Sequence, residues 1–373
     1  MNLPQIKKLT VKFNGRVVGY LADLENGIGF QYDESWLAEG FSISPFSLPL
    51  SSKVYVCNKP TFNGLYGVFA DSLPDGWGEL LFRRMLARQG VNADRVPSLT
   101  RLALVNERGL GGLQYEPNIS ELDDDERFDL DVLSAESAKI WGDEKNAANL
   151  DEIFRFGGSS GGARPKAHVK IQDDYWIVKF PCSVDPKNIG KQEYDANRLA
   201  QKAGINVNEF KLFPSKTCKG FFGAKRFDRV GNARVHVASL SSLLETSHRI
   251  PNLDYSHLMQ VVQRICVCKD DLYEVFRRMC FNVFFGNRDD HGKNFAFFYD
   301  ERVRGYRISP AYDITKTMDK PEHEMSVNGN GKPTAEDLLA VAKNASLQME
   351  RCKGILEAVR NCVALKGKVG ISH

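Results

Sequence analysis

The stretch Asn287-Arg288-Asp289-Asp290-His291-Gly292-Lys293-Asn294 interrupts an apolar region in the last third of the chain. The preceding segment, Asp271 to Phe285, carries apolar residues at helical spacing and runs into Gly286, so we predict a helix that ends there. Two short strands between residues 295 and 309 then form a hairpin that leads into Tyr312-Asp313-Ile314. An acid, an amide five positions later, a hairpin and a second acid follow the order that protein kinases use for phosphoryl transfer.

That chemistry requires cations for the phosphates, oxygen ligands for Mg²⁺ and a carboxylate near the acceptor hydroxyl. We predict that Asp289 accepts or orients the hydroxyl proton and that Asn294 and Asp313 bind the metal. Asp290 competes for the catalytic role, but the five-residue separation from Asn294 favours Asp289. We expect Asp290 to be a surface acid or to pair with Arg288. The alternative is an Asx-rich turn with solvated side chains.

A glycine-rich stretch, residues 157–166, precedes two predicted strands at 167–171 and 175–180. It matches neither the P-loop motif nor G-x-G-x-x-G. Its glycines would let backbone N–H groups approach phosphate oxygens, and Lys166 adds positive charge. Ser159 and Ser160 place hydroxyls in the same loop, which we expect to be mobile, so one of them is a candidate phosphorylation site. A flexible surface loop without a ligand is the alternative.

Lys179 ends the second of these strands, where a buried amine requires partners. Phosphates and a carboxylate from the next helix, predicted near 190–203, would provide them. Glu193, which we expect in the first turn of that helix, is the candidate. The alternative is a lysine that extends from the strand end to solvent.

The chain has 373 residues, enough for two or three domains. Turn residues Asn14-Gly15 predict an N-terminal β-hairpin, and a helix is expected from Gly76 to Arg88. The acidic segment 121–129 and the residues after it are interpreted as a boundary, although a solvated loop within one domain would have the same composition. A β-rich part followed by a mostly helical part predicts an α+β fold.

Composition excludes several classes of protein. The net charge of +3 gives no sign of bulk nucleic-acid binding, and no apolar run is long enough to span a membrane. The eight cysteines are scattered without CxxC pairs, which favours reduced thiols in a cytoplasmic protein over a metal site.

Several strings of the chain resemble those of the HipA family of serine/threonine kinases, the toxin components of bacterial toxin–antitoxin pairs. The string Phe69-Ala70-Asp71-Ser72-Leu73-Pro74-Asp75-Gly76-Trp77-Gly78 is similar to the family's N-terminal signature. The string Ser159-Ser160-Gly161-Gly162-Ala163-Arg164-Pro165-Lys166 is similar to its serine-bearing phosphate loop. The remaining matches follow in the family's order: Lys179, Glu193, Arg226-Phe227-Asp228-Arg229, the 287–294 loop and Tyr312-Asp313-Ile314. The chain departs from the family in having Asp290 where glycine is usual, and in the extra glycines and second serine of its phosphate loop.

The resemblance implies an ATP site in which Lys179 holds the phosphates, Asp289 is the catalytic acid, and Asn294 with Asp313 binds Mg²⁺. Further ATP contacts are expected from Glu193, Gly161, Gly162, Ala163, Lys166, Arg226, Phe227, His291 and Lys293. Ser159 matches the family's autophosphorylated serine, whose modification is associated with ejection of the loop and loss of activity. Ser160 is a second acceptor candidate.

Together these observations predict a cytoplasmic serine/threonine kinase that uses ATP and Mg²⁺. Its substrates would be a protein serine, such as one of an aminoacyl-tRNA synthetase, and its own glycine- and serine-rich loop. We expect a β-rich N-terminal subdomain at 1–148 and a two-lobed kinase-like domain at 149–373, with an N-lobe at about 149–230 and a C-lobe at about 231–373.

The resemblance also implies a partner, a small helix-turn-helix antitoxin of the HipB-like type that binds operator DNA. Two alternatives stay open at this point. One is a small-molecule phosphotransferase with the same ATP site. The other is a catalytically weak kinase-like scaffold that binds an antitoxin and DNA.

Overall fold

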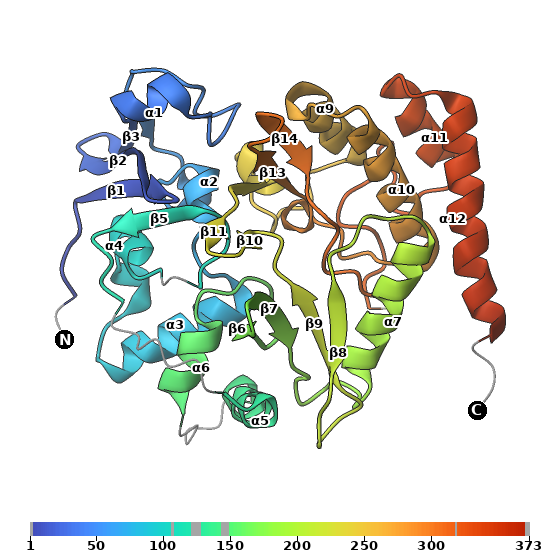
Figure 1. The fold of residues 1–373 in the computed structure, drawn as a ribbon, viewed down its shortest axis with the longest axis horizontal. Coiled ribbons are helices and arrows are strands. Elements are labelled where there is room, and N and C mark those ends of the chain that lie inside the picture. Colours follow the sequence, from blue (N-terminus) through green and yellow to red (C-terminus); the bar gives the residue numbers. More distant parts are fainter. Residues whose placement is uncertain (1–2, 106–107, 121–127, 143–148, 318, 370–373) are drawn as a thin grey trace. The chain divides into compact units, whose positions relative to one another are not determined.

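The computed structural model describes residues 3–105, 108–120, 128–142, 149–317 and 319–369 (Figure 1). The chain forms two compact units, and each unit is built from three separate stretches of the sequence. The first unit comprises Met1–Lys191, Lys211–Ala238 and Ser242–Thr246. The second comprises Gln192–Phe210, Ser239–Ser241 and Ser247–His373. Residues 121–127 of the acidic segment that we interpreted as a boundary lie outside the described residues.

The first unit begins with a five-stranded antiparallel sheet in the order β4-β3-β2-β1-β5. Its strands are β1 (Lys8–Phe13), β2 (Arg16–Leu24), β3 (Gly27–Tyr32), β4 (Tyr55–Cys57) and β5 (Leu113–Glu116). Asn14 and Gly15, which join β1 to β2, both have positive φ, of 48° and 79°. Such a pair makes the two-residue turn that fits the twist of a hairpin, and it confirms the predicted hairpin.

Six helices belong to this unit among its described residues. They are α1 (Glu34–Glu39), α2 (Gly67–Ala70), α3 (Gly76–Arg88), α4 (Ser98–Ala103), α5 (Leu130–Trp141) and α6 (Leu150–Gly157), with short 3₁₀ turns at Pro60–Phe62 and Ala93–Arg95. The helix predicted from Gly76 to Arg88 is confirmed at both ends. Trp77 and Leu81 of α3 are fully buried and pack with Ile153 and Phe156 of α6 in one apolar cluster.

A second antiparallel sheet has the order β6-β7-β9-β8 and completes the first unit. Its strands are β6 (Lys166–Ile171), β7 (Asp174–Lys179), β8 (Phe210–Phe213) and β9 (Phe221–Lys225), and a small ladder follows in β10 (Arg229–Val230) and β11 (Ala233–Arg234). Val169 of β6 and Trp176 of β7 join the same apolar cluster as α3 and α6. The two strands predicted after the glycine-rich stretch are therefore present and carry one side of this core.

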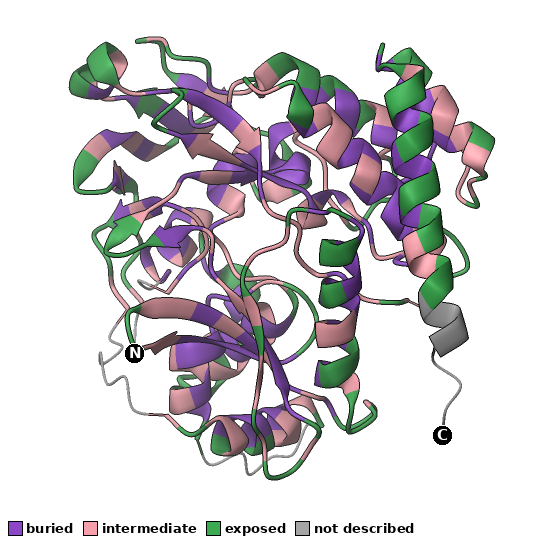
Figure 2. Ribbon diagram, turned by 45° about the vertical axis from the view of Figure 1, so that its right-hand side comes forward, coloured by how far each residue is buried: buried purple, intermediate pink, exposed green. Residues whose placement is uncertain are grey.

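The second unit is mainly helical. Its elements are most of α7 (Ile189–Lys202), the start of α8 (Leu240–Leu243), α9 (Tyr255–Ile265), α10 (Asp270–Phe285), a 3₁₀ turn at Gly292–Asn294, the hairpin β13 (Ala296–Asp300) and β14 (Gly305–Ile308), α11 (Ala335–Asn344) and α12 (Met349–Val369). The chain passes between the units at β12 (Val237–Ser239). Helix α10 contacts α9, α11 and α12. Buried residues recur at helical spacing along α12, at Cys352, Leu356 and Val359, between exposed ones (Figure 2).

The mixed α+β class and its antiparallel sheets agree with the prediction. One local expectation was wrong: Glu193 does not lie in the first turn of its helix, because α7 already begins at Ile189. Among the described residues, no helix combines the length and the apolar character needed to cross a membrane.

Candidate active site

The loop of residues 287–294 is positioned by the end of α10. Gly286 follows the helix with φ 81°, and its N–H donates to the carbonyl oxygen of Asn282. This left-handed cap is a conformation that glycine adopts without a steric penalty. It turns the chain out of the helix, so that residues 287–294 form a short loop before the β13–β14 hairpin.

Asp289 is the accessible acid of this loop. Its side chain is 36% exposed, and one carboxylate oxygen, Oδ1, accepts a hydrogen bond from Nζ of Lys320. Its backbone N–H donates to Oγ1 of Thr317 over 3.2 Å. The backbone is therefore held while the carboxylate is accessible to a substrate, as a catalytic acid or base requires.

Asp290, the next residue, is a buried acid. Its Oδ2 accepts from the hydroxyl of Tyr255 and lies 2.8 Å from Nδ1 of His323, and its Oδ1 accepts from the N–H of Glu324 at 3.0 Å. Its side chain is 0% exposed, so it is not a surface acid. The expectation that it lies at the surface or pairs with Arg288 was wrong. The physical reason is that a buried carboxylate must be satisfied by donors, and here three surround it.

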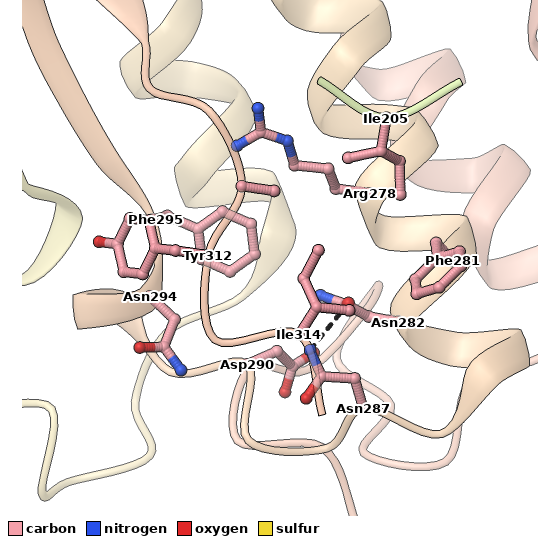
Figure 3. A pocket seen from close by; sticks show the side chains of 11 residues that line it. Ile205, Arg278, Phe281, Asn282, Asn287, Asp290, Asn294, Phe295, Tyr312 and Ile314 are labelled. Atoms are coloured by element: carbon pink, nitrogen blue, oxygen red, sulfur yellow. Dashed lines mark hydrogen bonds between the residues drawn. The ribbon is translucent and has the colours of Figure 1, made fainter. Parts of the chain in front are cut away.

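A buried chain of hydrogen bonds continues from Asp290 through Tyr255 to two amides. Nδ2 of Asn282 donates to the Tyr255 hydroxyl at 2.9 Å, and Nδ2 of Asn287 donates to Oδ1 of Asn282 at 3.1 Å (dashed line in Figure 3). Burial is the main cause that raises the pKa of Tyr255 well above its usual value, so this hydroxyl stays protonated and acts as a donor. The chain of bonds fixes the start of the loop against α9 and α10.

Asn294 and the segment around Tyr312 reach the same cavity. Nδ2 of Asn294 donates to the backbone carbonyl oxygen of Asp289 at 2.7 Å. The hydroxyl of Tyr312 donates to the carbonyl oxygen of Lys293 at 2.6 Å. Asn287, Asp290, Asn294 and Tyr312 all line one cavity (Figure 3).

Asp313 directly follows Tyr312 and has φ 52°. A left-handed conformation is uncommon for residues other than glycine, and it often marks positions where the chain is fixed for function. The bond from Tyr312 ties this turn to the loop that carries Asn294. The two predicted metal ligands therefore lie on segments joined by a hydrogen bond.

These donors suit Mg²⁺ by their chemistry. The part of the chain that the structure describes holds no cluster of three or more His, Cys, Asp and Glu side chains able to bind a metal by themselves. Mg²⁺ at phosphoryl-transfer sites usually takes only one or two protein oxygens and fills its other positions with phosphate and water. Since the amide nitrogen of Asn294 is used by Asp289, its Oδ1 is the atom suited to a cation, together with the Asp313 carboxylate.

The other predicted ATP contacts in the second unit have mixed surroundings. His291 is partly buried, its ring centroid lies 5.2 Å from that of His248, and its Nδ1 has no hydrogen-bond partner among the described residues. Lys293 is partly exposed. Glu193 is 8% exposed. Their predicted roles toward ATP stay predictions.

The glycine- and serine-rich loop of the first unit is closed rather than open. Ser159 is 7% exposed and Ser160 is fully buried, and the Ser160 hydroxyl donates to the carbonyl oxygen of Gly157 at 2.5 Å. Both hydroxyls are therefore buried in this structure, and the expected mobility of the loop stays a prediction. Gly161 is partly exposed, and Gly162 and Ala163 are exposed.

The loop is held by the start of α3, in the string that resembles the N-terminal signature. The carboxylate of Asp75 accepts from the N–H of Gly162, and the N–H of Trp77 donates to the Gly162 carbonyl oxygen at 2.8 Å. The N–H of Asp75 donates to the Ser160 carbonyl oxygen at 3.3 Å. A Cβ added at Gly78 would lie 2.3 Å from that oxygen, so glycine is required for this close approach. The signature thus has a structural role that the sequence analysis missed.

Two lysines predicted to bind phosphate lie in the first unit. Lys166 is 7% exposed, and its Nζ donates to the carbonyl oxygen of Gly161 within the loop. Lys179 is partly exposed, with Nζ 5.8 Å from the ring centroid of Phe222. Lys166 would have to leave its carbonyl partner to meet a phosphate.

Arg226, also predicted to contact ATP, is 4% exposed and fully engaged. Its guanidinium donates to both carboxylate oxygens of Asp228 and to the carbonyl oxygens of Arg108 and Gly109. Asp228 is buried, and burial alone would raise the pKa of its carboxyl group. The positive charges of Arg226 and Arg229 outweigh this effect and hold the pKa of Asp228 well below its usual range. In this structure Arg226 stabilises a turn of the chain, while neighbouring Phe227 is partly buried.

Comparison with families of known proteins gives two matches. A model described as HipA-like C-terminal domain matches residues 158–366, and one described as HipA N-terminal domain matches residues 9–116. A protein of Sinorhizobium fredii named "Putative kinase Y4dM" is 24% identical over 98% of this chain and 95% of its own length. A second, "Putative kinase Y4mE", is 24% identical over 85% of this chain and 79% of its own length.

Comparison with solved structures finds the same fold. The HipA of Shewanella oneidensis MR-1, solved as a complex of HipA, HipB and operator DNA, superposes with a TM-score of 0.70. The match covers 98% of this chain and 92% of that one at 16% sequence identity.

Proposed function

The chain belongs to the HipA family, and from this membership we propose that it is a serine/threonine protein kinase that uses ATP and Mg²⁺. The observation that carries the proposal is the contrast at the loop after α10. Asp289 is accessible, Asp290 is buried among donors, and Asn294 is bonded to the Asp289 carbonyl. The names of the two Sinorhizobium relatives agree with a phosphotransferase.

In the proposed reaction Asp289 orients the acceptor hydroxyl and takes its proton. The hydroxyl oxygen forms a bond to the γ-phosphorus of ATP, the bond from that phosphorus to the β–γ bridging oxygen breaks, and ADP leaves with the electron pair. Asn294 Oδ1 and the Asp313 carboxylate would hold Mg²⁺, which neutralises phosphate charge when bound. Asp290 is not the base, because its oxygens are occupied by three donors.

The remaining assignments complete the proposal. Lys179, supported by Glu193, and Lys166 would meet ATP phosphates, together with the backbone of Gly161, Gly162 and Ala163. Arg226, Phe227, His291 and Lys293 are proposed near the nucleotide, and for Arg226 this would need its present bonds to be exchanged. We propose a two-lobed kinase-like arrangement for residues 149–373, preceded by an N-terminal subdomain at 1–148.

Ser159, with Ser160 as the second choice, is the proposed site of self-phosphorylation. Because both are buried, the loop must leave the start of α3 before either hydroxyl can react. The protein substrate is proposed as the serine of another protein, such as an aminoacyl-tRNA synthetase.

We further propose a HipB-like helix-turn-helix antitoxin as partner and the cytoplasm as the location. The Shewanella HipA, which shares the fold, is described in a complex with HipB and operator DNA. Co-purification with the product of a neighbouring gene, followed by a mobility shift on the DNA upstream of both genes, tests this partner.

The test of catalysis is incubation of the purified protein with Mg²⁺ and labelled ATP, followed by mass spectrometry of the products. Phosphate on Ser159, Ser160 or an added protein, lost in Asp289→Asn, is the expected result. Asp319→Asn is the matched control, since Asp319 is an exposed acid in the segment after Asp313. Transfer only to sugars or aminoglycosides would favour a small-molecule phosphotransferase, and the absence of ATP binding would favour a non-catalytic scaffold.

A further inference from the structure

The segment that follows Asp313 is bonded to the backbone of the catalytic loop. Oγ1 of Thr317 accepts from the N–H groups of Arg288 at 2.7 Å and Asp289 at 3.2 Å. The guanidinium of Arg288 donates to the carbonyl oxygen of Lys320 at 2.6 Å. These bonds fix the backbone of Lys320 relative to that of Asp289.

Glu324 provides a second attachment. Its N–H donates to the carbonyl oxygen of Arg288 at 3.2 Å and to Oδ1 of Asp290 at 3.0 Å. Nδ1 of neighbouring His323 is hydrogen-bonded to Oδ2 of the same buried carboxylate, Asp290. The segment therefore meets the loop both before and after Lys320.

The side chain of Lys320 bridges two carboxylates. Its Nζ donates to Oδ1 of Asp289 and, over 2.7 Å, to Oε1 of Glu324. Partial burial opposes the charged form of this lysine, but the bonds to Asp289 and Glu324 outweigh it and raise the pKa of Lys320. The ammonium group is thus a fixed positive charge beside the proposed catalytic carboxylate.

This bridge contributes little to folding. The side chains of Lys320, Asp289 and Glu324 are 29%, 36% and 26% exposed, and ion pairs this accessible typically contribute about 0–1 kcal/mol. Its effect on Asp289 is more specific. With Oδ1 bound by the ammonium, rotation of the carboxylate is restricted, and Oδ2 has no donor among the described residues.

We propose that Lys320 is a positioning residue for phosphoryl transfer, which holds Asp289 so that Oδ2 receives the acceptor hydroxyl. The proposal rests on the kinase function proposed above. Glu324 keeps the ammonium in place, so that the lysine acts through Asp289 without touching the substrate. An enzyme gains rate from such fixed orientation because less freedom has to be lost on reaching the transition state.

The test compares Lys320→Met, which keeps the length of the side chain without its charge, with Lys320→Arg, which keeps the charge. We expect Lys320→Met to lower kcat roughly 10- to 100-fold with KM for ATP changed less than about two-fold, because orientation rather than nucleotide binding is lost. Lys320→Arg should recover most of that loss, and Glu324→Gln should show a smaller fall than Lys320→Met. Lys316→Met is the control, since Lys316 is an exposed lysine of the same segment.

Four outcomes would overturn the proposal. An unchanged kcat in Lys320→Met would show that Asp289 needs no holder, and a raised kcat would make the lysine an inhibitory cap. A fall in kcat matched by a fall in unfolding temperature, with no recovery in Lys320→Arg, would show a structural role alone. Failure of the wild-type protein to transfer phosphate to any acceptor would remove the proposed function itself. That last result is seen before any variant is made, so the two failures are distinguishable.

Discussion

The two loops that the sequence predicts to serve phosphate transfer, one in each unit, are built in opposite ways. The proposed catalytic loop, residues 287–294, leaves its acid Asp289 accessible, while its neighbour Asp290 is bound by buried partners. The serine loop, residues 158–165, buries its two hydroxyls and offers the carbonyl of Gly162 and its N–H to the start of α3. The first loop thus leaves its acid accessible to solvent, whereas the second must open before its serines are accessible.

The largest expected contrast between the two units is in their response to acid. Burial lowers the pKa of His168, on the strand after the serine loop, to about 3, and that of His236, in the same unit, to about 4. Both are neutral when folded but bind a proton when unfolded, so the free energy of unfolding falls as pH drops below about 6.5. Between pH 7 and pH 5 we expect a loss of about 2 kcal/mol for each histidine.

Hydrogen exchange measured at both pH values checks this expectation. Amides of β6 should lose protection more than those of α10, and a His168→Gln variant should reduce the difference. His257→Gln is the control, because His257 is an exposed capping residue of α9. Equal loss in both units would contradict the assignment of the acid sensitivity to buried histidines.

The second prediction separates the adjacent acids of the catalytic loop. Asp290→Ala leaves the Tyr255 hydroxyl, the Glu324 N–H and His323 without their acceptor, so it should lower the free energy of unfolding by about 3 kcal/mol. Asp289→Ala should change it by less than about 1 kcal/mol, since the side chains of its ion pair with Lys320 are about one-third exposed. Denaturant unfolding of both variants is the measurement. Similar losses from the two variants would remove the distinction on which the choice of base depends.

The sequence predicted local structure better than contacts between distant segments, and the reason is physical. Asp289 and Asn294 are five residues apart, and this spacing predicted that both belong to one loop. It did not predict the hydrogen bond from the Asn294 side chain to the backbone carbonyl oxygen of Asp289. Periodicity likewise predicted α3, because one face of that helix is buried by a regular repeat. Local patterns determine local geometry.

The features that could not be predicted from the sequence depend on contacts between residues far apart in the chain. Asp75 meets Gly162 across 87 positions, and Lys320 meets Asp289 across 31. Neither pair has a spacing that distinguishes it from other acids and lysines of the chain. The burial of Asp290 depends on Tyr255 and His323, which come from two other segments, so its role could not be read from the loop alone.

The third prediction is that a substitution at Gly78 opens the serine loop. Its Cβ would meet the carbonyl oxygen of Ser160, a backbone atom that cannot move without displacing the loop. Gly78→Ala should therefore cost about 2 kcal/mol and expose Ser160. Limited digestion within residues 158–165 by a protease of broad specificity, such as proteinase K, should become faster. Gly90→Ala is the control for backbone strain, because Gly90 also has a positive φ but has open space around it. Unchanged digestion would show that α3 does not hold the loop.

The smallest expected effect is that of removing the charge of Asp75, whose carboxylate accepts a hydrogen bond from the N–H of Gly162. Asp75→Asn keeps the shape of the side chain but replaces the charged acceptor. We therefore expect a loss of about 1 kcal/mol in the free energy of unfolding and moderately faster proteinase K cleavage within residues 158–165. Asp151→Asn is the matched control, because Asp151 is exposed and its ion pair with Arg88 is exposed as well. If the kinase proposal holds, the same variant should incorporate more phosphate at Ser159 than the wild type, since a loosened loop presents its hydroxyls more often. Less phosphate in Asp75→Asn would mean that the closed loop assists phosphate transfer, and the contrast between a prepared loop and a restrained one would then be reversed.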